Sequence, residues 1–109
     1  MNKLLLLLLL GSGAVRAEFW DGNRLYSHQT ASSVYDQMLA LGYVMGVADA
    51  LAGVRICSPD NATAGQKDDV VKKYLREHPA LRHHTADSLV VRALERVWPC
   101  QERRRGSTS

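Results

Sequence analysis

Cysteine is scarce in this chain of 109 residues, which contains only Cys57 and Cys100. A structural zinc site usually takes paired ligands a few residues apart, and no further pair stands at such a spacing. No stretch alternates apolar and polar residues with period two, so we expect no β-strand. The glycines stand singly, which leaves no glycine-rich loop to hold a phosphate group. These absences argue against a zinc domain, a β fold and a phosphate-binding loop.

Long hydrophobic runs are also missing, because the longest is the seven leucines at 4–10. A membrane-spanning helix needs about 20 apolar residues. Lys3 precedes the leucines and the small-residue site Val15-Arg16-Ala17 follows them, which is the pattern of a secretory signal peptide. We therefore predict that residues 1–17 are a signal peptide cleaved after Ala17, with no membrane segment left after cleavage.

The excess of positive over negative charge comes from the two ends of the chain. The whole sequence has 14 basic and 11 acidic residues, but between Glu18 and Cys100 nine basic residues accompany ten acidic ones. Arg103, Arg104 and Arg105 fall in a polar stretch after the last cysteine, so we expect residues 101–109 to be a disordered basic tail. Because the body is nearly neutral, no nucleic-acid partner is expected.

An exported chain with an even number of cysteines is expected to form disulfides. A Cys57–Cys100 bridge encloses 43 intervening residues, and the chain-entropy estimate gives it about 4 kcal/mol of stabilisation. Residues 18–100 form at most one small domain, whose core alone gives modest stability. The bridge is therefore expected to contribute a large share of the free energy of unfolding.

Four amphipathic segments predict an all-α bundle of four to five helices. Asp21 is placed to cap a short helix that continues to about His28. The capping box Thr63/Gln66 begins a helix that Pro79 ends at His78. The two remaining helices are expected from about Val34 to Gly53 and from Thr85 to Trp98.

The long central helix carries Gly42 and Gly46 on one face, with Asp49 on the same face and Tyr43 beside it. Each glycine inside a helix costs about 1 kcal/mol relative to alanine, which calls for a compensating close contact. We therefore predict that this stretch is the tightly packed seam of the bundle and that Asp49 has a structural partner there. The expected apolar face beside it consists of Val34, Met38, Leu41, Met45 and Ala48.

Candidates for catalysis are weak. His78, His83 and His84 gather near one interhelical link, but they lack the paired spacing of a zinc protease helix. The alternative that they bind a metal is kept open as the less favoured reading. No serine stands in a sharp-turn nucleophile motif, and both cysteines are assigned to the bridge. We expect no enzyme activity, no metal and no cofactor.

Several separated motifs resemble the Rap/Tai family of immunity proteins. They are Gly42-Tyr43-x-x-Gly46-Val47-x-Asp49-Ala50, Cys57-x-Pro59, Thr63 with Gln66, Val70-Val71-x-x-Tyr74-Leu75-x-x-His78-Pro79, and Ala93-Leu94 before Pro99-Cys100. The resemblance runs from about Trp20 to Cys100. It implies a small exported helical protein of the periplasm that binds a peptidoglycan amidase effector of type VI secretion, and it also implies a homodimer. A second cysteine pair that many members carry is missing here, which puts the identity of the effector in doubt.

Inhibition of an amidase would work by occlusion of its cleft. The segments expected to reach the partner join helices and carry polar groups that the core does not need. They are Ser58 to Asn61, with Ser58, Asp60 and Asn61, and Leu81 to His84, with Arg82 and His83. The alternative function is a stand-alone periplasmic helical protein with a structural or ligand-binding role and no amidase partner.

Overall fold

The computed structural model describes residues 19–101. The predicted signal peptide and all but the first residue of the predicted basic tail lie outside this range. The described chain contains four α-helices, one 3-10 turn and no strand, which confirms the all-α prediction. The elements are α2 (Gly22–Gln29), α3 (Val34–Ala50), α4 (Ala64–Glu77), η1 (Pro79–Leu81) and α5 (Ala86–Val97).

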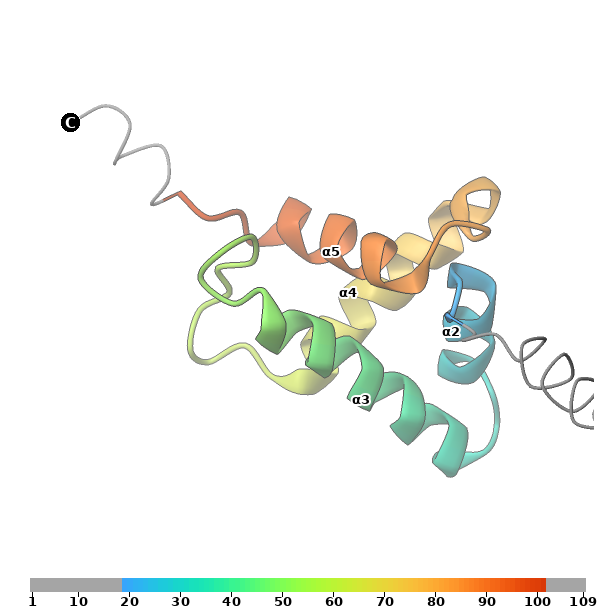
Figure 1. Cartoon of the computed structure of the whole chain (residues 1–109). Coiled ribbons are helices and arrows are strands. Elements are labelled where there is room, and N and C mark those ends of the chain that lie inside the picture. The colour runs from blue at the N-terminus through green and yellow to red at the C-terminus, as the bar shows by residue number, and fades with distance from the viewer. Residues whose placement is uncertain (1–18, 102–109) are drawn as a thin grey trace, which may run out of the picture.

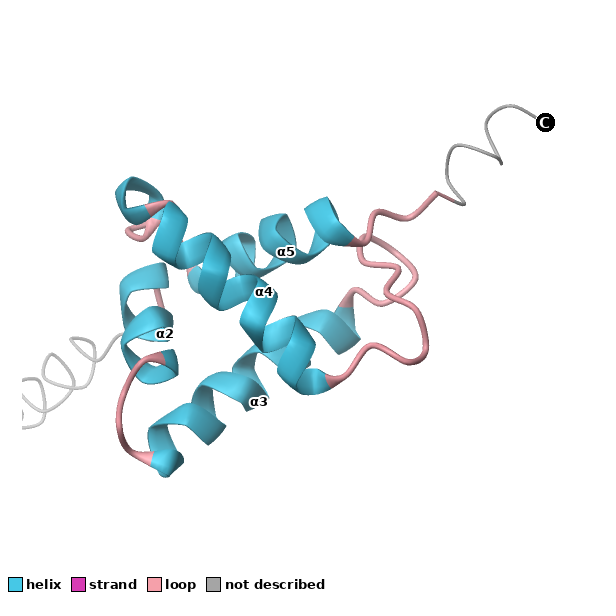
Figure 2. Cartoon of the chain, turned by 180° about the vertical axis from the view of Figure 1, so that it is seen from behind, coloured by secondary structure: helices cyan, strands magenta, loops and turns pink. Residues whose placement is uncertain are grey.

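The helices form a bundle in which α4 crosses α3 and α5 on one side (Figures 1 and 2). The short helix α2 closes one end of the bundle, and the loop between α3 and α4 lies at the other end (Figure 1). All four α-helices contribute to a single core. Its largest fully buried side chains are Leu25, Val44, Val71, Leu75, Leu89, Val90 and Leu94. Within residues 19–101 no helix has both the length and the apolar character needed to cross a membrane.

Side chains cap the N-termini of α2 and α4 as the sequence predicts. Asp21 Oδ1 accepts the backbone N–H of Arg24 at 2.8 Å and begins α2. At the start of α4 the Thr63 hydroxyl accepts the Gln66 N–H at 3.1 Å, while Gln66 Oε1 accepts the Thr63 N–H at 2.8 Å. Each bond satisfies an amide that has no partner inside the helix. Because Pro79 disfavours helical geometry at the residue before it, α4 ends at Glu77.

The orientation of α3 corrects the predicted packing face. The buried residues of α3 are Ala40, Val44 and Ala48, and of the expected set only Ala48 is among them. Val34 is 71% exposed and Met38 is 59% exposed. Because α3 is apolar all round, helical periodicity fits several faces, and the small alanines mark the one on which neighbouring helices approach most closely.

The predicted glycine seam is wrong for three of its four residues. A Cβ atom built on Gly42 or Gly46 would meet no heavy atom within 4 Å, and both glycines are exposed. Asp49 is exposed as well. Only Tyr43 is half-buried against the core. Within residues 19–101 the glycines of α3 therefore do not bring two helices together.

Candidate functional site

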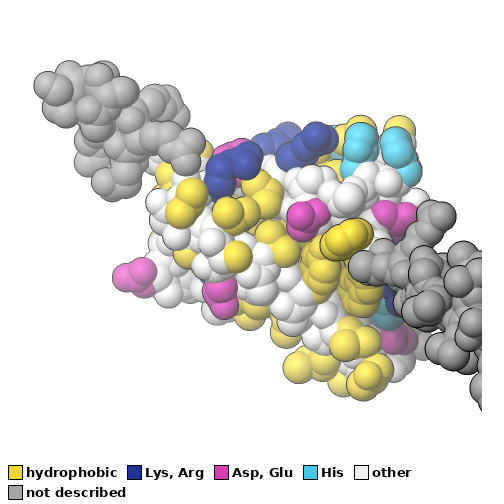
Figure 3. Space-filling model, in the orientation of Figure 1, with side chains coloured by type: hydrophobic (Ala, Val, Ile, Leu, Met, Phe, Trp, Pro, Cys, Tyr) yellow, Lys and Arg dark blue, Asp and Glu magenta, His cyan; other side chains and the backbone are white. Residues whose placement is uncertain are grey.

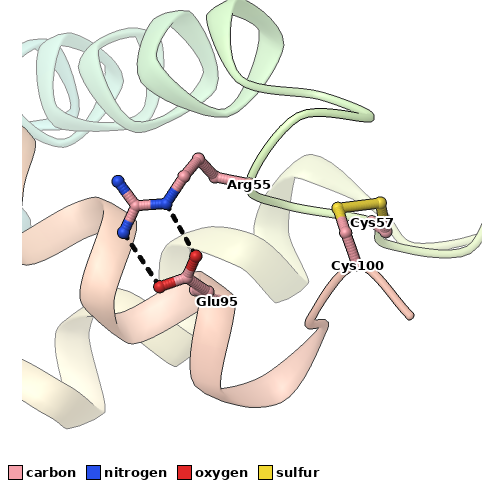
Figure 4. The surroundings of a disulfide bond; sticks show 4 residues. All are labelled: Arg55, Cys57, Glu95 and Cys100. Carbon is pink, nitrogen blue, oxygen red and sulfur yellow. Dashed lines mark hydrogen bonds and ion pairs between the residues drawn. A yellow bond between two sulfur atoms is a disulfide. The ribbon is translucent and has the colours of Figure 1, made fainter. Parts of the chain in front are cut away.

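The loop between α3 and α4 is fastened to the end of α5 by a disulfide (Figure 4). Cys57 and Cys100 are bonded, with their Cα atoms 4.9 Å apart, as the sequence predicts. The Cys57 N–H donates to the Trp98 carbonyl at 2.9 Å, and Ile56 pairs with Pro99 in an isolated bridge. A covalent bond and backbone hydrogen bonds thus hold the first part of this loop in one position.

A two-point ion pair adds a further contact between the loop and α5. Arg55 Nε and Nη2 donate to the two carboxylate oxygens of Glu95 at 2.7 and 3.0 Å (Figure 4). Hydrogen bonding to Glu95, and then its charge, raises the pKa of Arg55 above its ordinary value. The pair is open to solvent, so it fixes geometry more than it stabilises the fold.

Beyond the disulfide, the loop forms one wall of a hollow that we call the loop groove. It has a volume of about 430 Å³ and is lined by Pro59, Asn61, Ala62, Gln66, Asp69, Val70 and Trp98. Val70 also lines a second hollow of about 280 Å³ between α4 and α5, so the two adjoin. Tyr74, Ala93 and Val97 give the second hollow apolar surface, and Lys73, Glu77 and Arg96 give it charges of both signs. Apolar surface bordered by polar groups is the usual composition of a protein-binding patch.

The predicted partner-binding residues of this loop lie beside the loop groove. Asn61 lines it directly and is exposed, and Asp60 next to it is exposed as well. Ser58 is half-buried close to the disulfide. The disulfide-bonded loop thus presents polar side chains at the edge of a partly apolar hollow.

The second predicted segment lies at the opposite end of α5 (Figure 1). There Arg82 Nε donates to the Leu75 carbonyl at 2.7 Å, and its guanidinium lies 4.1 Å from the centre of the Tyr26 ring. Arg82 therefore satisfies a carbonyl in the last turn of α4, a role that the sequence did not reveal. His83 is exposed, with its ring 4.3 Å from that of His84. The structure does not bring the two predicted segments together.

Gly22, which no sequence motif marks, packs against the link at this second end of α5. The Gly22 N–H donates to the His84 carbonyl at 3.0 Å, and a Cβ at Gly22 would lie 2.9 Å from backbone atoms of Arg82. The start of α2 thus packs directly on the backbone of the link before α5. Gly22 follows the capping Asp21, but nothing local in the sequence indicates which segment approaches it.

Tyr43 takes part in an aromatic stack on the inner side of α3. The Trp20 ring lies between those of His28 and Tyr43, with centroids 4.6 and 5.2 Å away. Burial raises the pKa of the Tyr43 hydroxyl, the Asp87 charge raises it further, and a hydrogen bond with the Asp87 backbone partly offsets both. Of the four predicted seam residues, Tyr43 alone has the packing role expected of it.

The histidines show no arrangement for metal binding. His78 Nδ1 lies 2.8 Å from the Tyr74 carbonyl, and the His78 ring stacks on that of Tyr74. Among residues 19–101, no three side chains of metal-ligating type come together. What residues 19–101 do present is the disulfide-bonded loop beside the loop groove, and this arrangement is suited to binding.

Comparison with models of protein families identifies one family. The family model described as Rap1a immunity proteins matches residues 21–100. The matched range contains the four α-helices described within residues 19–101, the disulfide and both interhelical segments discussed above. No curated protein matches the chain.

Proposed function

We propose that this chain, which belongs to the family of Rap1a immunity proteins, is an exported inhibitor of a peptidoglycan amidase delivered by type VI secretion. Family membership implies immunity to a secreted effector, and therefore a protein partner. The resemblance of its motifs to the Rap/Tai family supports an amidase as that effector and a homodimer as a second contact. The chain acts by binding and catalyses nothing itself.

The observation that carries this proposal is the disulfide-bonded loop at the loop groove. A loop already fixed by a covalent bond, by the Cys57–Trp98 hydrogen bond and by the Arg55–Glu95 pair loses little conformational freedom on binding. Asp60 and Asn61 enter the amidase cleft in this proposal, while the partly apolar groove receives surface from the rim of the cleft. Such an arrangement keeps substrate out of the amidase cleft without any covalent reaction.

The proposed location is the periplasm. Residues 1–17 have the composition of a signal peptide. The disulfide supports an oxidising compartment, because such bonds persist outside the cytosol and are rare within it. Peptidoglycan lies in the same compartment, so the inhibitor would meet its amidase where the amidase acts.

The test is inhibition of a type VI peptidoglycan amidase by this chain, measured as peptidoglycan hydrolysis and as rescue of growth when the amidase is directed to the periplasm. Asn61→Arg adds bulk and charge beside the groove and should weaken inhibition at least tenfold. Ser27→Arg introduces the same side chain at an exposed position of α2 and should inhibit like the wild type. His83→Arg tests whether the segment at the opposite end of α5 contributes to inhibition.

The outcomes show which of the two segments contacts the amidase and which of the two functions is supported. A large loss in Asn61→Arg with normal inhibition by His83→Arg would place the contact at the disulfide-bonded loop. The reverse pattern would move the contact to the other end of α5. Wild-type protein that neither binds nor rescues would overturn the proposal and favour the stand-alone periplasmic role.

A further inference from the structure

The second hollow, between α4 and α5, is bordered by charged side chains that have no ionic partner. Lys73 and Glu77 stand four residues apart on α4, and Arg96 lines the same hollow from α5. Within residues 19–101, none of these three charges belongs to an ion pair. A lysine that precedes a glutamate is the less favourable order for a pair at this spacing, so the two side chains gain little from each other. All three side chains are exposed, and their charges are open to a bound group.

The apolar part of the second hollow is held in place. Tyr74 is 9% exposed and Ala93 is 2% exposed, while Val97 beside them is 50% exposed. The His78 ring stacks on the Tyr74 ring with 4.3 Å between their centroids, and the Arg96 guanidinium lies 5.6 Å from the centre of the same ring. These contacts fix the Tyr74 ring before anything binds. An apolar side chain seated on it would therefore order few further groups of this chain.

The charge around the second hollow favours an acidic occupant. Two of its three charged residues are cationic, and the exposed Arg76 and Arg92 add positive charge one turn away along each helix. Lys and Arg side chains gather over α5 in the space-filling view (Figure 3). Positive charge of this kind speeds the approach of an acidic surface and disfavours a basic one.

The second hollow continues the surface that the proposed function uses. Val70 lines both hollows. One face of α4, which lies beside α5 in Figure 2, runs along both hollows and carries Gln66, Asp69, Val70, Lys73, Tyr74 and Glu77. This face is about 16 Å long at 1.5 Å for each residue. A partner that receives Asp60 and Asn61 at one end of this face is therefore within reach of the other end.

We propose that the second hollow is a docking site for an acidic segment of the partner amidase, with an apolar side chain on Tyr74 and a carboxylate between Lys73 and Arg96. This inference rests on the proposed function and adds a second contact to that of the disulfide-bonded loop. The apolar side chain supplies buried surface. The two cations donate charge-assisted hydrogen bonds to the carboxylate, and they select an acidic segment over a basic one.

The first experiment measures the affinity of the mature, disulfide-bonded protein for the amidase at physiological ionic strength. Arg96→Glu sets a like charge against the docked carboxylate and should weaken binding at least tenfold. Arg92→Glu is the matched control, because it makes the same reversal on α5 at an exposed position outside the hollow. Salt screens such a charge, so the control should weaken binding less than threefold.

The sign of the effect at Glu77 tests the charge of the docked segment. Glu77→Gln removes a negative charge that repels the docked carboxylate, so it should tighten binding about two- to fivefold. A basic or zwitterionic segment would instead lose affinity. Circular dichroism shows whether each variant folds like the wild type.

The second experiment tests the second hollow without the amidase. The probe is a terminally blocked peptide with one leucine flanked by two aspartates, and its control carries lysines in place of the aspartates. In nuclear magnetic resonance titrations to millimolar concentration, the acidic probe should shift the amide signals of Tyr74, Ala93 and Val97. The basic probe should not shift them, and Arg96→Glu should abolish the response to the acidic probe.

The combined outcomes distinguish this inference from the function on which it rests. Equal losses in Arg96→Glu and Arg92→Glu, weaker binding by Glu77→Gln, or no preference for the acidic probe would overturn the inference. If the amidase is still inhibited and Asn61→Arg still weakens inhibition, only the second contact is removed. A response to the acidic probe in the expected pattern, with no amidase bound by the wild type, would support the ligand class of the hollow and remove the amidase partner.

Discussion

On α3, apolar residues face the core on one side of the helix and face outward on the other. Ala40, Val44 and Ala48 are at most 3% exposed, while Val34 and Tyr35 are more than 70% exposed. All of them are apolar or aromatic, so hydrophobicity alone does not distinguish the two faces. Position in the bundle does, because α4 and α5 pack only on the side of α3 that carries Ala40, Val44 and Ala48. The inner face of α3 therefore stabilises the fold, and the outer face is available to a partner.

The largest effect that tests this contrast comes from placing the same charge on each face. Val44→Asp places a carboxylate in the apolar core, so we expect a loss of more than about 3 kcal/mol in the free energy of unfolding. Met38→Asp makes the same change at an exposed position and should stay within about 0.5 kcal/mol of the wild type. Urea unfolding at low protein concentration measures both. Equal losses in the two variants would show that the outer face is covered within the monomer.

The second prediction contrasts Gly22 with the glycines of α3. An added methyl group at Gly22 would meet the Arg82 backbone at 2.9 Å and the Leu89 side chain, so Gly22→Ala should cost about 1–3 kcal/mol through overpacking. The control is Gly65→Ala, where the nearest atom is 3.9 Å away. Thermal unfolding of both variants gives the comparison, and an unchanged Gly22→Ala would mean that the link carrying Arg82 moves aside without cost.

The glycines show how far the sequence could predict this fold. Helix ends could be predicted because caps such as Asp21 and the Thr63/Gln66 box act within a few residues, and the disulfide followed from an even cysteine count. The packing partner of a glycine depends on segments far away in the chain. Gly22 meets the link before α5, about sixty residues later, whereas the pair in α3 meets nothing within residues 19–101. Spacing placed Gly42 and Gly46 on one face and could not determine what lies over it.

The candidate site was predictable to a similar degree. Asp60 and Asn61 were expected at a polar loop between helices, and the structure places them beside a groove that Trp98 completes from the far end of the chain. Arg82 was expected to face a partner, and the structure gives it a further role as a donor to the last turn of α4. A long cationic side chain near a helix end can serve either role, and only the fold shows which carbonyl it reaches.

A smaller effect of opposite sign is expected at the outer glycines. Gly42→Ala and Gly46→Ala fill open space and remove the entropy cost of glycine inside a helix, so each should stabilise the monomer by about 1 kcal/mol. In a domain of this size that gain raises the melting temperature by roughly 4–8 °C. A loss of stability at low concentration would contradict the exposed placement of both glycines.

The smallest expected effect belongs to Asp49, which the sequence predicted to have a structural partner. It is exposed near the end of α3, where a negative charge opposes the helix dipole. Asp49→Asn should therefore leave the stability of the dilute monomer unchanged or raise it by up to about 0.5 kcal/mol. Thermal unfolding measures the difference, and a clearly lower melting temperature of Asp49→Asn would restore the structural role that the sequence predicted.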